Sequence, residues 1–316
     1  MAIDVQNHLF TPSLIEAALK APAGSPGNIL ANVYRREGDA MTTLEPRMAE
    51  MEEASVELLI LSVVGLETFY ADERTATIDL IRRSNDELIE AVETRADRFA
   101  ALVTLPFPYA DDCLEELRRL QGPLVRGVIA SAATDSWTLD EPRLEPVFAE
   151  LARRRMPVML HPAQGQLQQF KAVRDWRLSS SINAMIETSI AGARMMLSGM
   201  LDRVSDLTLI VPHLGGVLPY LTQRIVDQSA TGDAQHDVLY YLQNRVLFDS
   251  CSFYHPALTC AVETVTADRI LLGSDYPFRG TLKRAVDDIK TSGLSEAEQE
   301  AILRGNAIRC GIAYGR

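Results

Sequence analysis

Short apolar segments alternate with longer segments of helical periodicity along most of the chain. The apolar segments are rich in Val, Ile and Leu at nearly every position, which indicates strands buried on both faces. The predicted strands span residues 2–5, 56–61, 99–105, 125–129, 157–160, 207–211, 246–248 and 270–272. The predicted helices span residues 12–19, 41–54, 75–94, 111–120, 141–154, 182–201, 217–230 and 257–265.

Eight strands, each followed by helical sequence, predict a parallel sheet covered by helices. Eight such units within 316 residues favour a (β/α)₈ TIM barrel, an α/β fold, over a doubly wound sheet. No internal repeat, linker or composition break indicates a second domain, so we expect residues 1–316 to form a single barrel domain. Residues 21–40 are rich in Gly, Pro and Asn and predict a loop-rich excursion from it.

The composition narrows the class of protein. Lys and Arg number 31 and Asp and Glu 43, a net charge of −12, which argues against a protein that binds nucleic-acid phosphates. The most apolar stretch, residues 58–65, is shorter than the roughly 20 residues that span a bilayer, and no signal peptide is evident. The four cysteines lie too far apart for a zinc knuckle or a disulfide framework. We expect a cytoplasmic protein without a nucleic-acid or membrane partner.

Residues that could bind a metal or transfer a proton lie at the ends of predicted strands. His8, His161 and His213 closely follow the first, fifth and sixth strands, and Asp275 follows the eighth. The carboxyl ends of parallel barrel strands open on one face, so we expect these four side chains to converge there. Imidazole and carboxylate are ligands that divalent transition metals favour. A capping or turn role explains one such residue well but four of them poorly.

Several motifs resemble the amidohydrolase superfamily, and within it the aminocarboxymuconate-semialdehyde decarboxylase branch. The resemblance covers nearly the whole chain in the expected order, and the His-x-Gly-Gly and Gly-Ser-Asp-Tyr-Pro elements are its specific parts. The matching segments are residues 3–8 (IDVQNH), 160–162 (LHP), 212–216 (PHLGG), 273–277 (GSDYP) and 305–307 (GNA).

The resemblance implies a metal-dependent hydrolase type of barrel with one divalent metal ion. Carried over to this chain, the family's ligand positions are Gln6, His8, His161 and Asp275, and His213 is the acid or base beside the metal. We expect zinc, with manganese as the alternative. As the sole anionic ligand, Asp275 leaves the site with a charge of about +1, which suits an anionic substrate.

Gln6 departs from the family pattern, which has His at this position, or Glu in some decarboxylases of the branch. A glutamine carbonyl oxygen is a weaker donor to zinc than imidazole or carboxylate. Three interpretations remain: a metal with Gln6 as a ligand, a metal held by His8, His161 and Asp275 only, or no metal. We favour a retained metal.

Three further residues are candidates for binding substrate. The family often places an arginine near Arg47, which lies on the helix before the second strand, to hold a substrate carboxylate. Arg224 follows the His-x-Gly-Gly element, and some relatives contribute such a residue across a dimer interface. His255 follows the seventh strand on the same predicted rim. Trp176 and Phe170 are candidates for an aromatic wall, and each of these residues also has a purely structural interpretation.

The resulting hypotheses share one site. In the first, the protein is a lyase that decarboxylates an aromatic or unsaturated carboxylic acid without oxidation, with His213 or Asp275 delivering the proton. In the second, the same site hydrolyses or hydrates a C–C, C–O or C–N bond of a related small acid. In the third, the barrel is catalytically degenerate and only binds. We favour the lyase, acting as a homodimer on a small-molecule carboxylate.

Overall fold

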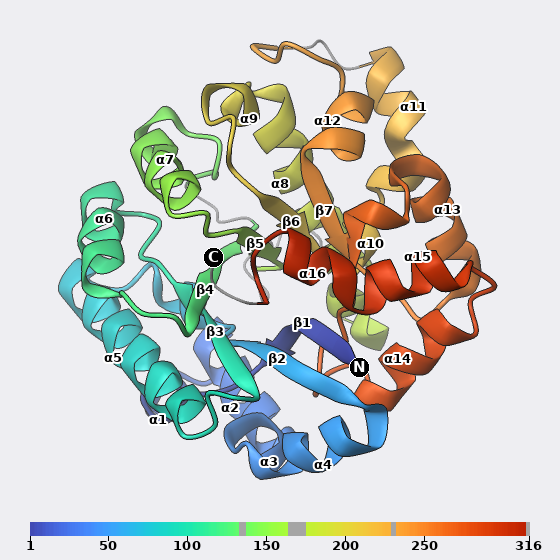
Figure 1. The fold of residues 1–316 in the computed structure, drawn as a ribbon. Coiled ribbons are helices and arrows are strands. Elements are labelled where there is room, and N and C mark those ends of the chain that lie inside the picture. The colour runs from blue at the N-terminus through green and yellow to red at the C-terminus, as the bar shows by residue number, and fades with distance from the viewer. Residues whose placement is uncertain (133–136, 164–174, 229–231, 314–316) are drawn as a thin grey trace.

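Eight parallel strands form the centre of the protein, in the computed structural model that describes residues 1–132, 137–163, 175–228 and 232–313. Each strand lies beside the next one in sequence, in the order β1 to β8, and helices surround the sheet (Figure 1). The strands are β1 Ala2–His8, β2 Val56–Ser62, β3 Phe99–Thr104, β4 Val125–Ser131, β5 Val158–His161, β6 Leu209–Val211, β7 Val246–Asp249 and β8 Ile270–Leu271. The prediction of a (β/α)₈ barrel is confirmed.

The helices form the outer layer of the barrel. They are α1 Pro12–Lys20, α2 Pro26–Glu37, α3 Asp39–Thr42, α4 Glu45–Ala54, α5 Arg74–Glu93, α6 Ala110–Arg119, α7 Glu145–Arg153, α8 Ala184–Leu197, α9 Met200–Arg203, α10 Pro212–Gly215, α11 Leu218–Gln228, α12 Val238–Asn244, α13 His255–Val265, α14 Leu282–Lys290, α15 Glu296–Glu300 and α16 Asn306–Arg309. Short 3₁₀ or π segments include η1 Leu66–Phe69 and η5 Ser179–Asn183. No helix in these described ranges is both long and apolar enough to cross a membrane.

The barrel closes between its first and last strands. Val5 N donates to Leu272 O at 2.9 Å, Asp275 N to Gln6 O at 3.0 Å and His8 N to Tyr276 O at 2.9 Å. The buried carboxylate of Asp4 strengthens this seam, because it accepts from both the backbone N (3.1 Å) and Oγ (2.5 Å) of Ser274. Gln6, His8 and Asp275 are thereby fixed next to one another.

The first strand is longer than the sequence pattern predicts. It continues beyond the predicted end at residue 5 through Gln6, Asn7 and His8, and all three are buried. Their polar side chains find partners inside the barrel: Asn7 Nδ2, for example, donates to Asp4 Oδ2 at 2.6 Å. The strand therefore carries its polar residues into the site instead of ending before them.

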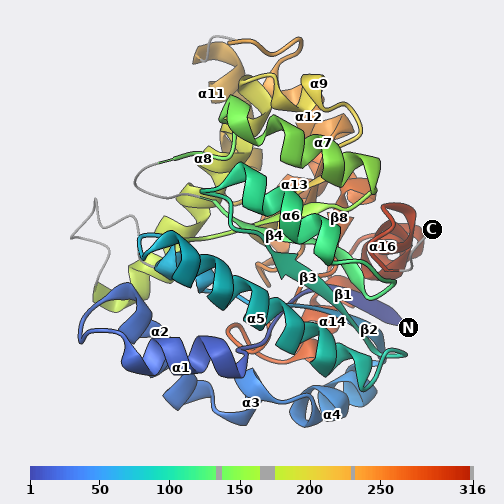
Figure 2. The ribbon, with the colours of Figure 1, turned by 90° about the vertical axis from the view of Figure 1, so that its left-hand side faces the viewer.

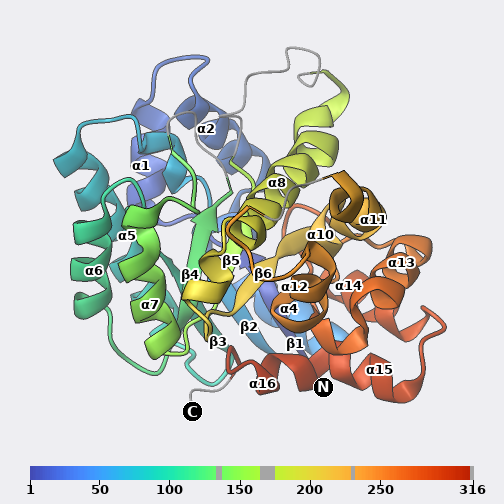
Figure 3. The same ribbon diagram turned by 90° about the horizontal axis from the view of Figure 1, so that it is seen from above.

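The prediction of a loop for residues 21–40 is wrong, because α2 occupies most of that segment. Ser25 caps this helix by accepting from Asn28 N at 3.3 Å, and Pro26 takes the first helical position. Leu30, Ala31 and Val33 form its buried face. The Gly and Pro residues at its start suggested a loop, although they belong to the cap. Figures 2 and 3 place α2 at the end of the barrel opposite to α16 and the N-terminus.

Candidate active site

The ends of three strands bring the predicted metal ligands together. His8 ends β1, His161 ends β5, and Asp275 follows β8. One donor atom from each of the three lies within 4.8 Å of the others, and all three residues are buried. The convergence predicted from the strand ends is therefore observed for these side chains, although 153 and 114 residues separate them along the chain.

Hydrogen bonds fix the orientation of the His8 ring. Its Nδ1 lies 2.9 Å from Ser62 Oγ, whose own proton is directed at Asn7 O. Ser62 Oγ therefore accepts from His8 Nδ1–H, which leaves the lone pair of Nε2 facing Asp275 Oδ1 at 3.0 Å. Two lone pairs at this distance require a positive charge between them, either a proton or a cation.

His161 presents a second lone pair to the same point. Its Nδ1 donates to Pro162 O at 3.0 Å, which leaves Nε2 as the free ring nitrogen. Burial and the nearby His8 lower the pKa of His161 to about 3, so its ring is neutral at physiological pH. The His8 and His161 rings meet edge to face with centroids 5.0 Å apart. This donor set of two imidazoles and one carboxylate fits a divalent metal ion.

Asp275 supplies the negative charge of the cluster. Burial disfavours its carboxylate, and hydrogen bonds from His213 and His8 outweigh burial, so the pKa of Asp275 lies well below its usual range. Its backbone is in the left-handed region (φ +56°), which costs energy for a residue other than glycine. The bond from Asp275 N to Gln6 O holds this conformation.

His213 lies beside the cluster, with Nε2 3.8 Å from Asp275 Oδ2. Burial lowers its pKa and the Asp275 carboxylate raises it; the carboxylate prevails, so the pKa of His213 is raised. The residue has φ +57°, and Gly215 and Gly216 of its motif also have positive φ. A Cβ at Gly215 would collide with Phe248, and one at Gly216 with Ser189 and Met185. The two glycines therefore let the backbone turn tightly behind His213.

Gln6 lies on the His213 side of the cluster. Its Nε2 is 3.3 Å from His213 Nε2, while its Oε1 is buried without a hydrogen-bond partner in the described part of the chain. Asp249, the last residue of β7, accepts from His213 N at 2.8 Å and from Cys251 N at 2.9 Å through Oδ1. Burial raises the pKa of Asp249 to about 6.

A cavity of about 490 Å³ opens directly onto the cluster. His161, His213 and Asp275 form its floor, and α2 and α8 contribute to its walls. Its lining carries the cations Arg36, Arg177 and Arg279 against the carboxyl groups of Asp275 and Glu187. Burial raises the pKa of Glu187 to about 7, which further reduces the negative charge. The cavity therefore suits a small anion.

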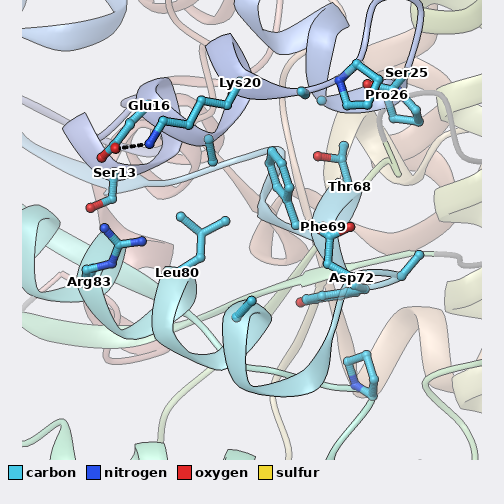
Figure 4. Close-up of a pocket in the computed structure, with 18 of the residues that line it drawn as sticks. Ser13, Glu16, Lys20, Ser25, Pro26, Thr68, Phe69, Asp72, Leu80 and Arg83 are labelled. Atoms are coloured by element: carbon cyan, nitrogen blue, oxygen red, sulfur yellow. Dashed lines mark hydrogen bonds and ion pairs between the residues drawn. The ribbon is translucent and has the colours of Figure 1, made fainter.

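A larger hollow of about 990 Å³ lies elsewhere, between α1, η1 and α5 (Figure 4). An ion pair between Lys20 and Glu16 spans one side of it, and Phe69 and Leu80 form apolar parts of its lining. None of the clustered histidines, nor Asp275, lines this hollow. We therefore place the chemistry at the smaller cavity.

Arg47 does not line the cavity, although the sequence made it a candidate for binding a substrate carboxylate. Its side chain is fully buried, and its guanidinium donates to the carbonyl oxygens of His8 and of Thr43. It also lies over the ring of Tyr276, 5.3 Å from the centroid. Burial lowers the pKa of Arg47 to about 10. In this position Arg47 supports the end of β1 that carries His8.

Replacing Arg47 with methionine should reduce the free energy of unfolding by about 1–3 kcal/mol, because the buried carbonyls of His8 and Thr43 lose their donor. Urea unfolding measures this loss. Arg35→Met is the control, since Arg35 is an exposed residue of α2, and it should change stability by less than about 0.5 kcal/mol. An Arg47→Met protein of unchanged stability with a raised KM would instead indicate contact with substrate.

Two other candidates for binding substrate, His255 and Arg224, do not line the cavity. His255 begins α13 and its Nε2 is 3.1 Å from Asp288 O on α14. Arg224 lies on an exposed face of α11. Trp176 does line the cavity, although its side chain is largely exposed. Phe170 lies outside the described residues.

Several residues of the site were not predicted from the sequence. Asp249 ends β7 as His8 ends β1, so the rule that found the histidines also identifies this carboxylate. Glu187 and the three cavity arginines carried no such signal, because they lie on helices or loops whose orientation the sequence pattern leaves open.

Comparisons with known proteins identify the family of this chain. The sequence profile described as "Amidohydrolase" matches residues 3–310, so the chain belongs to the amidohydrolase family. Gamma-resorcylate decarboxylase of Rhodococcus jostii (strain RHA1) is 30% identical over 280 residues, covering 83% of this chain and 85% of that protein. The 2-amino-3-carboxymuconate-6-semialdehyde decarboxylase of Dictyostelium discoideum is 27% identical and covers 83% of this chain and 74% of that protein. The family resemblance inferred from the motifs is confirmed.

Solved structures show the same fold. A 2,6-dihydroxybenzoate decarboxylase complexed with 2,6-dihydroxybenzoate superposes with a TM-score of 0.86 at 25% identity, covering 98% of both chains. A dihydroxybenzoic acid decarboxylase from Polaromonas sp. JS666, with bound manganese and the inhibitor 2-nitroresorcinol, has a TM-score of 0.85 at 24% identity and covers 98% of this chain and 96% of that one. The second likeness supports the fold alone.

Proposed function

We propose that this protein catalyses the non-oxidative decarboxylation of an aromatic or unsaturated carboxylic acid. One observation carries the proposal: a cluster of polar side chains lies at a cavity that three arginines line. The cluster consists of His8, His161, Asp275 and His213. The two named relatives above are decarboxylases of such acids, and they match most of this chain. An acid with a hydroxyl group beside its carboxylate, as in resorcylate, is the substrate class we favour.

The proposal includes one divalent metal ion, which His8, His161 and Asp275 would hold. The two imidazole lone pairs and the carboxylate that face one another support this assignment. When bound, the metal supplies positive charge beside the substrate carboxylate and its neighbouring oxygen. The donor set accepts zinc or manganese, and zinc remains our first expectation. Elemental analysis after dialysis against each metal decides between them.

The reaction needs only a proton and no oxidant. The bond between carbon and the carboxylate breaks, CO₂ leaves, and the electron pair stays on the carbon, which takes up a proton. The Asp275 carboxylate, with Oδ2 3.8 Å from His213 Nε2, outweighs burial and raises the pKa of His213, which favours its protonated form. In our proposal His213, which borders the cavity, delivers this proton to the carbon. The lowered pKa of Asp275 and its place among the proposed metal ligands argue against Asp275, the alternative donor. Arg36, Arg177 and Arg279 favour entry of the anionic substrate.

A panel of metal-loaded assays tests the proposed activity. The purified protein, dialysed against zinc or manganese, is given gamma-resorcylate, 6-methylsalicylate and an unsaturated dicarboxylate, and CO₂ release is measured. We expect release from at least one ortho-hydroxylated acid, with one deuteron incorporated into the product ring in D₂O. Hydrolysis of a matched amide or ester panel, without CO₂ release from any acid, would overturn the proposal in favour of a hydrolase.

We further propose that the protein is a cytoplasmic homodimer, with a face of α8 in the interface. Ile186 and Ile190 of α8 and Ile182 of the preceding η5 follow one another at four-residue intervals and are 36%, 52% and 51% exposed. Such an exposed apolar stripe fits a second copy of this chain. In this proposal Arg224 is supplied across the interface, as in some relatives.

Replacing both Ile186 and Ile190 with aspartate should convert the homodimer to a monomer, because two charges would be buried in an apolar contact. Light scattering after size-exclusion chromatography measures the mass. Leu19→Asp is the control, since Leu19 is similarly exposed, at 48%, but lies on α1. A wild-type protein that is monomeric at micromolar concentration would contradict the dimer.

A further inference from the structure

We infer that Gln6 is not a metal ligand but a hydrogen-bond bridge from the His213 ring to the Asp249 carboxylate, and that this bridge determines which ring nitrogen of His213 carries the proton. The inference rests on the proposed function only in giving His213 a proton to deliver. Three polar groups carry it: the Gln6 amide and the Asp249 carboxylate, which approach one another over Gly273, and the His213 ring, which lies against the Gln6 amide.

The amide of Gln6 lies between the His213 ring, which can donate a hydrogen bond, and the Asp249 carboxylate, which only accepts. Its Nε2 is 3.3 Å from His213 Nε2, and its Oε1 is buried without a partner in the described residues. Within the same described residues, Asp249 Oδ2 is also buried without a partner. A carboxylate oxygen only accepts hydrogen bonds, and an amide offers one donating and one accepting end. The Gln6 amide is thus the matching group for Asp249 Oδ2.

Gly273 shows that the two side chains approach the same place. A Cβ added to this glycine would lie 2.9 Å from Asp249 Cγ and 3.1 Å from Gln6 Oε1. The side of the Gln6 amide that points away from His213 therefore shares the space over Gly273 with the Asp249 carboxyl group. Only glycine leaves room for both side chains, which explains why the Gly-Ser-Asp-Tyr-Pro element begins with glycine.

A half-turn of the Gln6 amide about its last side-chain bond satisfies these groups together. Oε1 then accepts from His213 Nε2–H, and Nε2 donates toward Asp249 Oδ2. Gln6 Oε1 and Asp249 Oδ2, both buried without a partner, then gain one. The contact between Gln6 Nε2 and His213 Nε2 becomes a contact between Gln6 Oε1 and His213 Nε2. The opposite orientation leaves the amide oxygen beside the carboxylate, where two acceptors repel.

Asp249 acts on His213 in two ways in this arrangement. Through Oδ1 it holds the backbone N of His213, whose φ is +57°, and so fixes where the ring leaves the chain. Through Oδ2 and Gln6 it favours the tautomer that carries the proton on Nε2, the nitrogen that also faces the Asp275 carboxylate. Gln6 and Asp275 therefore act in the same direction. Asp249 and Gln6 are therefore positioning residues for His213, and the metal retains His8, His161 and Asp275 as its protein ligands.

Asp249→Asn provides the most direct test, because asparagine keeps an accepting oxygen for His213 N and Cys251 N but presents an NH₂ group toward Gln6. The Gln6 amide must then turn its oxygen to Asn and its nitrogen to His213, which shifts the ring proton toward Nδ1. ¹⁵N NMR of the imidazole nitrogens reports the tautomer, measured on metal-free, substrate-free protein at a pH where the ring is neutral. His213→Gln assigns the signals.

We expect Nε2–H in the wild-type protein and a larger population of Nδ1–H in Asp249→Asn, where the NH₂ group of Gln6 opposes the Asp275 carboxylate. The control Glu187→Gln alters a buried carboxyl of the same cavity that bonds Ala163 N and Asn183 instead, and it should leave the tautomer unchanged. A wild-type ring protonated on Nδ1, or an unchanged tautomer in Asp249→Asn, would overturn the bridge. The NMR measurement does not depend on activity. The tautomer result can therefore be interpreted even if the protein does not decarboxylate any acid.

Metal titration of Gln6→Ala tests the other half of the inference and does not require the Asp249 variant to fold. Removing a residue that is not a ligand should change zinc or manganese affinity by less than about threefold, whereas loss of a group that orients or binds the metal costs about 10–100-fold. A tenfold or greater loss in Gln6→Ala would show that the amide coordinates the metal. The His213 ring should also lose its preference for Nε2–H in this variant.

Discussion

Replacing Asp275 with asparagine is expected to abolish both metal binding and turnover. The variant keeps the shape of the side chain but removes the only negative charge among His8, His161 and Asp275. The lone pairs of the two imidazoles then have no anionic partner for a divalent ion, and affinity should fall by at least about 100-fold. Calorimetric titration with zinc and manganese measures the affinity, and CO₂ release measures turnover.

A matched control separates this effect from a general loss of charge. Asp288→Asn removes a carboxylate of α14 that pairs with His255, 3.4 Å away, outside the cavity. It should leave metal affinity and turnover within about twofold of the wild type, because it touches none of the proposed ligands. Tight metal binding retained in Asp275→Asn would contradict the proposed ligand set.

Replacing His213 with glutamine should lower kcat by about 10²–10⁴-fold while metal content stays at one equivalent. Glutamine retains hydrogen-bonding capacity near Asp275 but cannot hold and release a proton at physiological pH. Steady-state kinetics on the best acid of the panel, with elemental analysis of the same sample, separate the loss of proton transfer from a loss of metal.

His236→Gln is the control for the histidine substitution. The His236 ring stacks on Tyr240 with centroids 3.7 Å apart, and it does not line the cavity. Its replacement should leave kcat unchanged within about twofold. A His213→Gln enzyme slowed only a few-fold would contradict the role of His213 as proton donor, and a variant that has lost its metal would make His213 part of the metal site.

The barrel and its rim were predictable because both follow from local pattern. Strands that are apolar at nearly every position indicate a parallel sheet under helices, and a polar residue at the end of such a strand lies at its mouth. This reasoning placed His8, His161 and Asp275 together, and His213 beside them. It failed for α2, where Pro26 and Gly27 belong to a helix start and Leu30 and Val33 carry the buried face.

The sequence pattern did not predict the direction in which individual side chains point. Arg47 was weighed as a substrate ligand or a solvated charge, and the structure buries it against the backbone of His8. His255 lies at a strand-following position, but its ring contacts α14. In both cases the partner is a backbone carbonyl of another element, and no periodicity in the residue's own segment encodes that contact.

The amino-acid sequence by itself determined the barrel, the strand ends that carry the chemistry and the family to which the chain belongs, because hydrophobic periodicity and short motifs are local properties. The tertiary structure decided which polar atoms face one another. Asp4 ties β1 to β8, Gly273 leaves room for Gln6 and Asp249, and Ser62 turns the His8 lone pair toward Asp275. These contacts join residues far apart in sequence, and they form only when the closed barrel excludes water and each buried polar group must find a partner.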